Sequence, residues 1–70
     1  MENKIPKKNE YWVIRHSDIL ETIYYYNVVL VLEDKKKLNP PNWRKNRFRC
    51  EHLGKEYEIS GKFFIEQCFN

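Results

Sequence analysis

Alanine is absent from the 70 residues of this chain, and glycine and cysteine occur only twice each. Because alanine is the strongest helix former, its absence beside two tryptophans, five tyrosines and four phenylalanines disfavours a helical domain and favours strands. Gly54 and Gly61 alone cannot supply a glycine-rich phosphate loop. Cys50 and Cys68 are too few for the disulfide framework of a small secreted domain. Proteins that bind phosphate through a glycine-rich loop and small secreted domains held together by disulfides are therefore excluded.

A long hydrophobic run is also missing. The longest apolar stretch, from Val28 to Leu32, is far shorter than a membrane span. The polar, lysine-bearing stretch from Met1 to Asn9 has no apolar core of the kind found in a secretory leader. We therefore expect no membrane partner and a cytoplasmic protein with reduced thiols. A composition rich in lysine, asparagine, isoleucine and tyrosine without alanine is typical of an AT-rich genome, such as that of a phage or mobile element.

Alternation of apolar and polar residues predicts five strands. One short helical turn is predicted over Ser17 to Glu21, where Asp18 and Glu21 have the spacing of a capping box. The fold class that follows is mainly β: a small five-stranded antiparallel barrel, SH3-like or partly open, with a single curved sheet as the alternative. The last three strands are expected to form a meander. The five predicted strands are Glu10 to His16, Thr22 to Leu32, Arg47 to His52, Glu56 to Ser60 and Lys62 to Phe69.

The strand from Thr22 to Leu32 is expected to lie at the centre of the sheet. It is apolar on both faces, so both faces are expected to be covered, one by the barrel interior and the other by a loop or a partner. We assign the face of Leu30 to the core and expect Leu30→Ala to be strongly destabilising. In the later strands, Phe48, Cys50 and His52 are expected to share one face, and Tyr57 and Ile59 are expected to point inward.

The chain divides into a tail and one domain. Residues 1–9 offer only Ile5 as an apolar anchor, so they are expected to form a flexible N-terminal tail. Residues 10–70 form a single small β domain, interrupted by a long basic loop at 33–46 that contains Pro40 and Pro41. A core this small often needs support from a partner subunit, so a homodimer remains an open alternative.

Positive charge is concentrated between Lys35 and Cys50, where seven basic residues occur with no acidic one. Basic side chains neutralise phosphates and an aromatic ring can stack on a base, so this segment predicts binding of single-stranded or duplex nucleic acid. An acidic protein surface and a purely solubilising role are the alternatives. The predicted contact residues are Lys35, Lys36, Lys37, Trp43, Arg44, Lys45, Arg47 and Arg49.

Three consecutive tyrosines, Tyr24, Tyr25 and Tyr26, form the second candidate site. Successive strand residues face opposite ways, so at least one of these rings must be partly exposed or paired with something else. Tyrosine is enriched at recognition surfaces because it combines a large ring with a polar hydroxyl. These residues are therefore a candidate protein interface, with a satisfied buried tyrosine as the alternative.

Candidate catalytic and metal-binding sets are weak. His16, Ser17 and Asp18 are adjacent and so cannot adopt the geometry of a nucleophilic triad. Glu56 and Glu58 share the outer face of a short strand and have no evident pocket. The spacing of the possible ligands does not follow that of structural zinc sites, so we expect no metal and no cofactor. Those possible ligands are His16, Cys50, His52 and Cys68.

The sequence thus predicts a binding module that is not an enzyme. Nucleic acid, bound through the basic loop, is the leading ligand. The alternative is a small inhibitor or adaptor, of phage or mobile-element origin, that binds a host protein through an aromatic face or a sheet edge.

Overall fold

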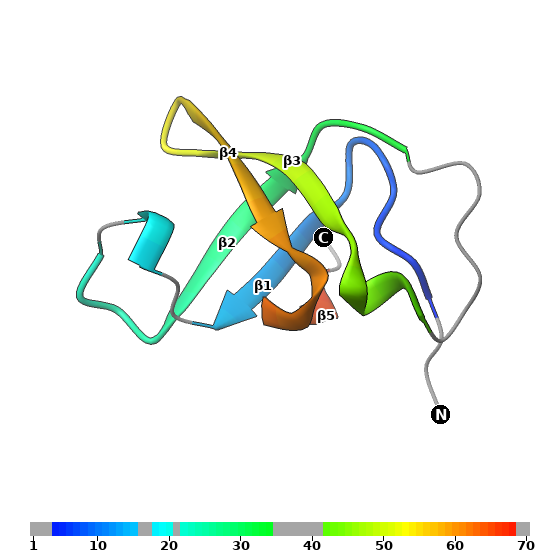
Figure 1. The fold of residues 1–70 in the computed structure, drawn as a ribbon. Helices are drawn as coiled ribbons and strands as arrows, with labels where there is room; N and C mark the ends of the chain where they lie inside the picture. Colours follow the sequence, from blue (N-terminus) through cyan, green and yellow to red (C-terminus); the bar gives the residue numbers. More distant parts are fainter. Residues whose placement is uncertain (1–3, 16–17, 21, 35–41, 69–70) are drawn as a thin grey trace.

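In the computed structural model, residues 4–15, 18–20, 22–34 and 42–68 are described. Five antiparallel strands form one sheet in the order β4-β3-β2-β1-β5, which leaves β4 and β5 as unjoined edges (Figure 1). The predicted mainly-β, five-stranded, partly open fold is confirmed. No helix among these residues has the length and apolar character that crossing a membrane requires. The elements are β1 (Tyr11–Arg15), η1 (Asp18–Leu20), β2 (Tyr26–Val31), η2 (Asn42–Lys45), β3 (Arg47–His52), β4 (Lys55–Ser60), η3 (Gly61–Phe63) and β5 (Phe64–Gln67), where η marks a 3-10 turn.

The path of the last strand differs from the predicted meander. β3 and β4 form a hairpin as expected, but η3 redirects the chain and β5 pairs with β1 instead of β4. The Ser60 hydroxyl accepts a hydrogen bond from the Lys62 backbone nitrogen and so caps this turn. Gly61 does mark a turn, as predicted, but the strand that follows this turn pairs with β1 and not with β4.

The buried face of β2 is the opposite of the one assigned from sequence. Val29 is 1% exposed and Val31 is fully buried, whereas Leu30 is only half-buried and Val28 is 48% exposed. The assignment of Leu30 to the core was wrong, because Val29 and Val31 occupy the core in its place. The strand is also shorter than predicted, because it begins at Tyr26 and not at Thr22.

The other inward faces agree with the sequence. Phe48, Cys50 and Ile59 are fully buried, and Tyr57 packs against the core as a half-buried residue. The predicted helical turn is present as η1, which lies beside β4 and contributes buried Leu20 to the core.

Aromatic rings fill the centre of the core. Trp43 from η2 makes edge contacts with Trp12, Phe48 and Phe64, at centroid distances of 6.1, 6.0 and 6.2 Å. Arg44 lies over the Trp43 ring at 4.3 Å and donates hydrogen bonds to the carbonyl oxygens of Phe64 (2.5 Å) and Gly61 (3.3 Å). The segment predicted as one long loop therefore contributes a tryptophan to the core.

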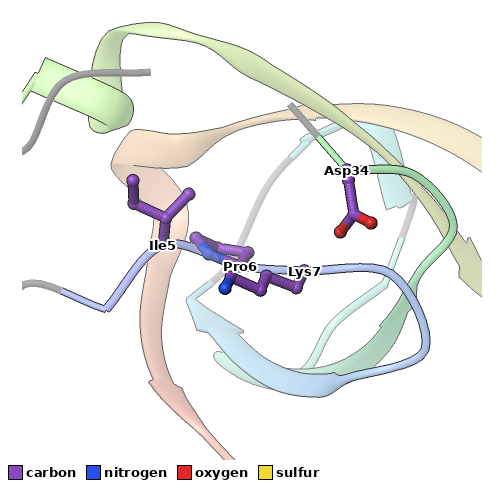
Figure 2. Close-up of a pocket in the computed structure, with 4 residues that line it drawn as sticks. All are labelled: Ile5, Pro6, Lys7 and Asp34. Carbon is purple, nitrogen blue, oxygen red and sulfur yellow. The ribbon is translucent and has the colours of Figure 1, made fainter. Parts of the chain in front are cut away.

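The N-terminal segment packs on the domain from residue 4 onward, where the sequence predicted a flexible tail over residues 1–9. Pro6 is fully buried, and the Asn9 backbone nitrogen donates to the Val31 carbonyl oxygen at 2.8 Å. The Lys8 backbone nitrogen donates to the Asp34 carboxylate at 2.7 Å. Figure 2 shows Asp34 opposite Ile5, Pro6 and Lys7, which together line a hollow of about 240 Å³. Residues 1–3 lie outside the described chain.

Glu10 helps to hold this segment in place. Its carboxylate accepts hydrogen bonds from the Trp12 indole and the Lys7 backbone nitrogen, both at 3.0 Å, and lies 3.4 Å from the Lys4 ammonium. Burial by itself would raise the pKa of Glu10, but these hydrogen bonds and the positive charge together lower it. The ionised carboxylate is therefore the form that ties the segment to β1.

Candidate functional site

The predicted nucleic-acid segment does not form one continuous surface. Lys35, Lys36 and Lys37 lie outside the described residues. Trp43 is only 3% exposed, so its ring is not available to stack on a base, and this part of the prediction was wrong. Arg44 is turned back onto Trp43 and the carbonyl oxygens of η3 and β5. The physical reason is that a small core recruits the large indole.

Arg47 and Arg49 lie on the outer face of β3, opposite acidic residues of β4. Arg47 is 3.9 Å from Glu58, and Arg49 is 3.5 Å from Glu56. All four side chains are more than half exposed, so these pairs contribute little to stability. They do place a carboxylate beside each guanidinium, which weakens the attraction of this face for phosphates.

A groove lined in part by basic residues, which we call the basic groove, lies at one end of β3 and β4. Its charged lining residues are Lys45, Arg47, Lys62 and Glu58, and it encloses about 370 Å³. Phe63 also lines it, with the Lys62 ammonium 5.3 Å and the Arg15 guanidinium 5.8 Å from the ring centroid. Sequence reasoning missed Lys62, Arg15 and Phe63 because they lie outside the basic run and are brought there by folding.

The three tyrosines lie on the surface, as one of the two interpretations predicted. Tyr24, Tyr25 and Tyr26 are 67%, 79% and 66% exposed, and the preceding Ile23 is 91% exposed. They occupy the end of the connection from η1 and the start of β2. In this connection the Thr22 hydroxyl accepts a hydrogen bond from the Tyr24 backbone nitrogen at 3.2 Å. The Asn27 side-chain amide donates to the Tyr24 carbonyl oxygen at 3.3 Å, so both backbone polar groups of Tyr24 are hydrogen-bonded within this connection.

The exposed apolar area continues along the outer face of β1 and β2. The register pairs Tyr11 with Leu30, and Val13 with Val28, on the face opposite the buried residues. Tyr11 is 45% and Val28 is 48% exposed. We call the exposed members of this area and of the preceding connection the tyrosine surface. The tyrosine surface comprises Tyr11, Ile23, Tyr24, Tyr25, Tyr26 and Val28.

The candidate residues for catalysis or metal binding that the structure describes do not come together in one site. Glu56 and Glu58 lie on the exposed face and face Arg49 and Arg47. Cys50 is buried, and burial followed by the charge of Glu33 raises the pKa of its thiol to about 12. Within the part of the chain that the structure describes, no three histidine, cysteine or acidic side chains are grouped as metal ligands. His16 and Ser17 fall outside that part.

Comparisons of the chain with protein-family models, curated proteins and solved structures find no match. The candidate site therefore has to be judged on its own geometry.

Proposed function

We propose that this protein is a non-enzymatic binding module that recognises another protein through the tyrosine surface. The observation that carries the proposal is the exposure of six apolar and aromatic side chains on one connection and two adjacent strands. Soluble monomers rarely expose contiguous apolar area of this kind unless it is used for binding. Tyrosine suits such a surface because its ring gives a large contact area at a low cost in conformational entropy.

A small inhibitor or adaptor fits this architecture. The domain presents rigid strands and a hydrogen-bonded connection, so little ordering is needed when a partner docks. Its action would consist of occupying a surface of the partner.

The test is capture from a lysate of the organism that carries the gene, with and without nuclease. We expect a retained protein partner that survives nuclease treatment and is lost with the double variant Ile23→Ser/Tyr25→Ser. Both side chains are largely exposed, so this variant should keep its fold. The matched control is Lys45→Ser/Lys62→Ser, which alters the basic groove and should retain the partner.

Nucleic acid is the second candidate, favoured by the basic groove of Lys45, Arg47 and Lys62. If it is the ligand, log affinity should fall linearly with log salt concentration, and the Lys45→Ser/Lys62→Ser variant should lower both the affinity and the slope. Loss of the captured material with nuclease, together with no effect of Ile23→Ser/Tyr25→Ser, would favour this function and contradict the proposal.

A further inference from the structure

A groove lies between the tip of the β3–β4 hairpin and the connection that carries Tyr24. It encloses about 430 Å³, and its lining is formed mainly by Leu20, Tyr24, Leu53 and Tyr57, with His52 and Lys55 at the hairpin. Figure 1 shows the hairpin tip and η1 at the same end of the molecule, away from the N-terminal segment. The groove thus adjoins the tyrosine surface through Tyr24, a residue common to both.

Leu53 is an unusual residue for its position. His52 and Lys55 are paired across the hairpin, so Leu53 and Gly54 form a two-residue turn, with φ values of +51° and +84°. Turns with positive φ at both central residues favour asparagine, aspartate or glycine at the first, because a larger side chain is strained in this region. Leu53 is nevertheless 90% exposed, so its side chain contributes almost nothing to the core. A strained, exposed leucine beside a groove points to a role in recognition.

The charge of the groove indicates the kind of partner. Lys55 is the one lysine, and no arginine, aspartate or glutamate is found, among its described lining residues. Alternation along β4 places Lys55 and Tyr57 on one face, and turns Glu56 and Glu58 to the other, where they meet arginines. An apolar cleft with a cation at its edge is complementary to an apolar side chain next to a carboxylate.

We propose that this groove binds an apolar side chain of a partner protein segment, between Tyr24, Leu53 and Tyr57, with an adjacent acidic residue of that segment on Lys55. The inference rests on the proposed protein-binding function and specifies the chemistry of the partner.

The direct test is an NMR titration of isotope-labelled protein with the acetylated, amidated peptide Gly-Asp-Leu-Asp-Gly at millimolar concentration. We expect amide shifts at Tyr24, Leu53, Lys55 and Tyr57. Peptides with a central serine, or with lysines in place of the aspartates, should shift these signals far less. Equal shifts with the lysine peptide, or none with the aspartate peptide, would overturn the inference. So would shifts that arise from raising the protein concentration alone, since the occupant would then be a second copy.

Leu53→Asn separates recognition from folding, because asparagine suits the turn. The variant should melt at the same temperature or higher, yet bind the aspartate peptide roughly tenfold more weakly or worse. Lys55→Glu should invert the preference toward the lysine peptide. If both variants bind the peptide as the parent does, the groove is not the site. A nuclease-resistant partner that is still captured by these variants, but not by Ile23→Ser/Tyr25→Ser, would leave the protein-binding function standing and refute this groove.

Discussion

Trp43→Ala is expected to unfold the domain. The indole is 3% exposed and touches Trp12, Phe48 and Phe64, so its removal leaves a large cavity among these three rings. Truncating a buried tryptophan costs about 3–5 kcal/mol, and a core of this size rarely supplies more than about 3–5 kcal/mol in total. Thermal unfolding followed by circular dichroism measures the effect.

The control is Trp43→Phe, which keeps an aromatic ring in the cavity and should remain folded with a lower melting temperature. A folded Trp43→Ala variant with an unchanged melting temperature would place the indole on the surface. It would also restore the interpretation that Trp43 stacks on a nucleic-acid base.

Gly61→Ala is expected to be the most damaging of the single-methyl additions. A Cβ atom at position 61 would lie 2.8 Å from the Arg44 Cα and 2.9 Å from the Trp43 carbonyl oxygen. Both are backbone atoms of η2, so rotation of a side chain cannot relieve the contact. Relief requires η3 and η2 to separate, which would disturb the hydrogen bonds of Arg44 to Gly61 and Phe64. We expect a loss of about 1–3 kcal/mol or more in the free energy of unfolding, measured by urea denaturation.

Gly54→Ala is the matched control. The added Cβ meets no atom within 4 Å, and the cost arises only from the positive φ of +84°. We expect a loss of roughly 1 kcal/mol, smaller than that at Gly61. Equal losses at the two sites would show that η2 does not pack on Gly61 as closely as described.

The strands could be predicted because each has a period of two in its own sequence. Arg47 to His52 alternates arginine and glutamate with phenylalanine and cysteine, which sets its buried face without further information. β2 has apolar residues on both faces, so its sequence could not decide between Leu30 and Val31. The decision comes from pairing with β1, where Trp12 opposite Val29 places two buried side chains together.

Long-range partners account for the parts that sequence missed. No feature of the sequence from Phe64 to Gln67 indicates that β5 pairs with β1 and forms an edge of the sheet. The N-terminal segment has a polar composition, yet backbone hydrogen bonds to Val31 and the burial of Pro6 fix it in place. Trp43 follows a proline pair in a basic run, which resembles an exposed loop, and its burial depends on ring contacts with Trp12 and Phe64, which are distant in the sequence.

The tyrosine surface could be predicted only in part. Three consecutive tyrosines require an exposed ring, and all three prove to be more than half exposed. The contribution of Tyr11 and Val28 depends on the register of β1 and β2. The groove at Leu53 depends on a hairpin tip that meets a distant connection, and the signal available beforehand was a leucine in front of the turn glycine at position 54.

Site-directed photo-crosslinking in the lysate distinguishes recognition through the tyrosine surface from binding at the basic groove. A benzoylphenylalanine replaces Tyr25 on the tyrosine surface in one variant and Lys62 at the basic groove in another. We expect the position 25 variant to form a single crosslinked protein adduct that resists nuclease, and the position 62 variant to form none. Adducts from position 62 but not from position 25, or adducts that nuclease abolishes, would contradict recognition through the tyrosine surface.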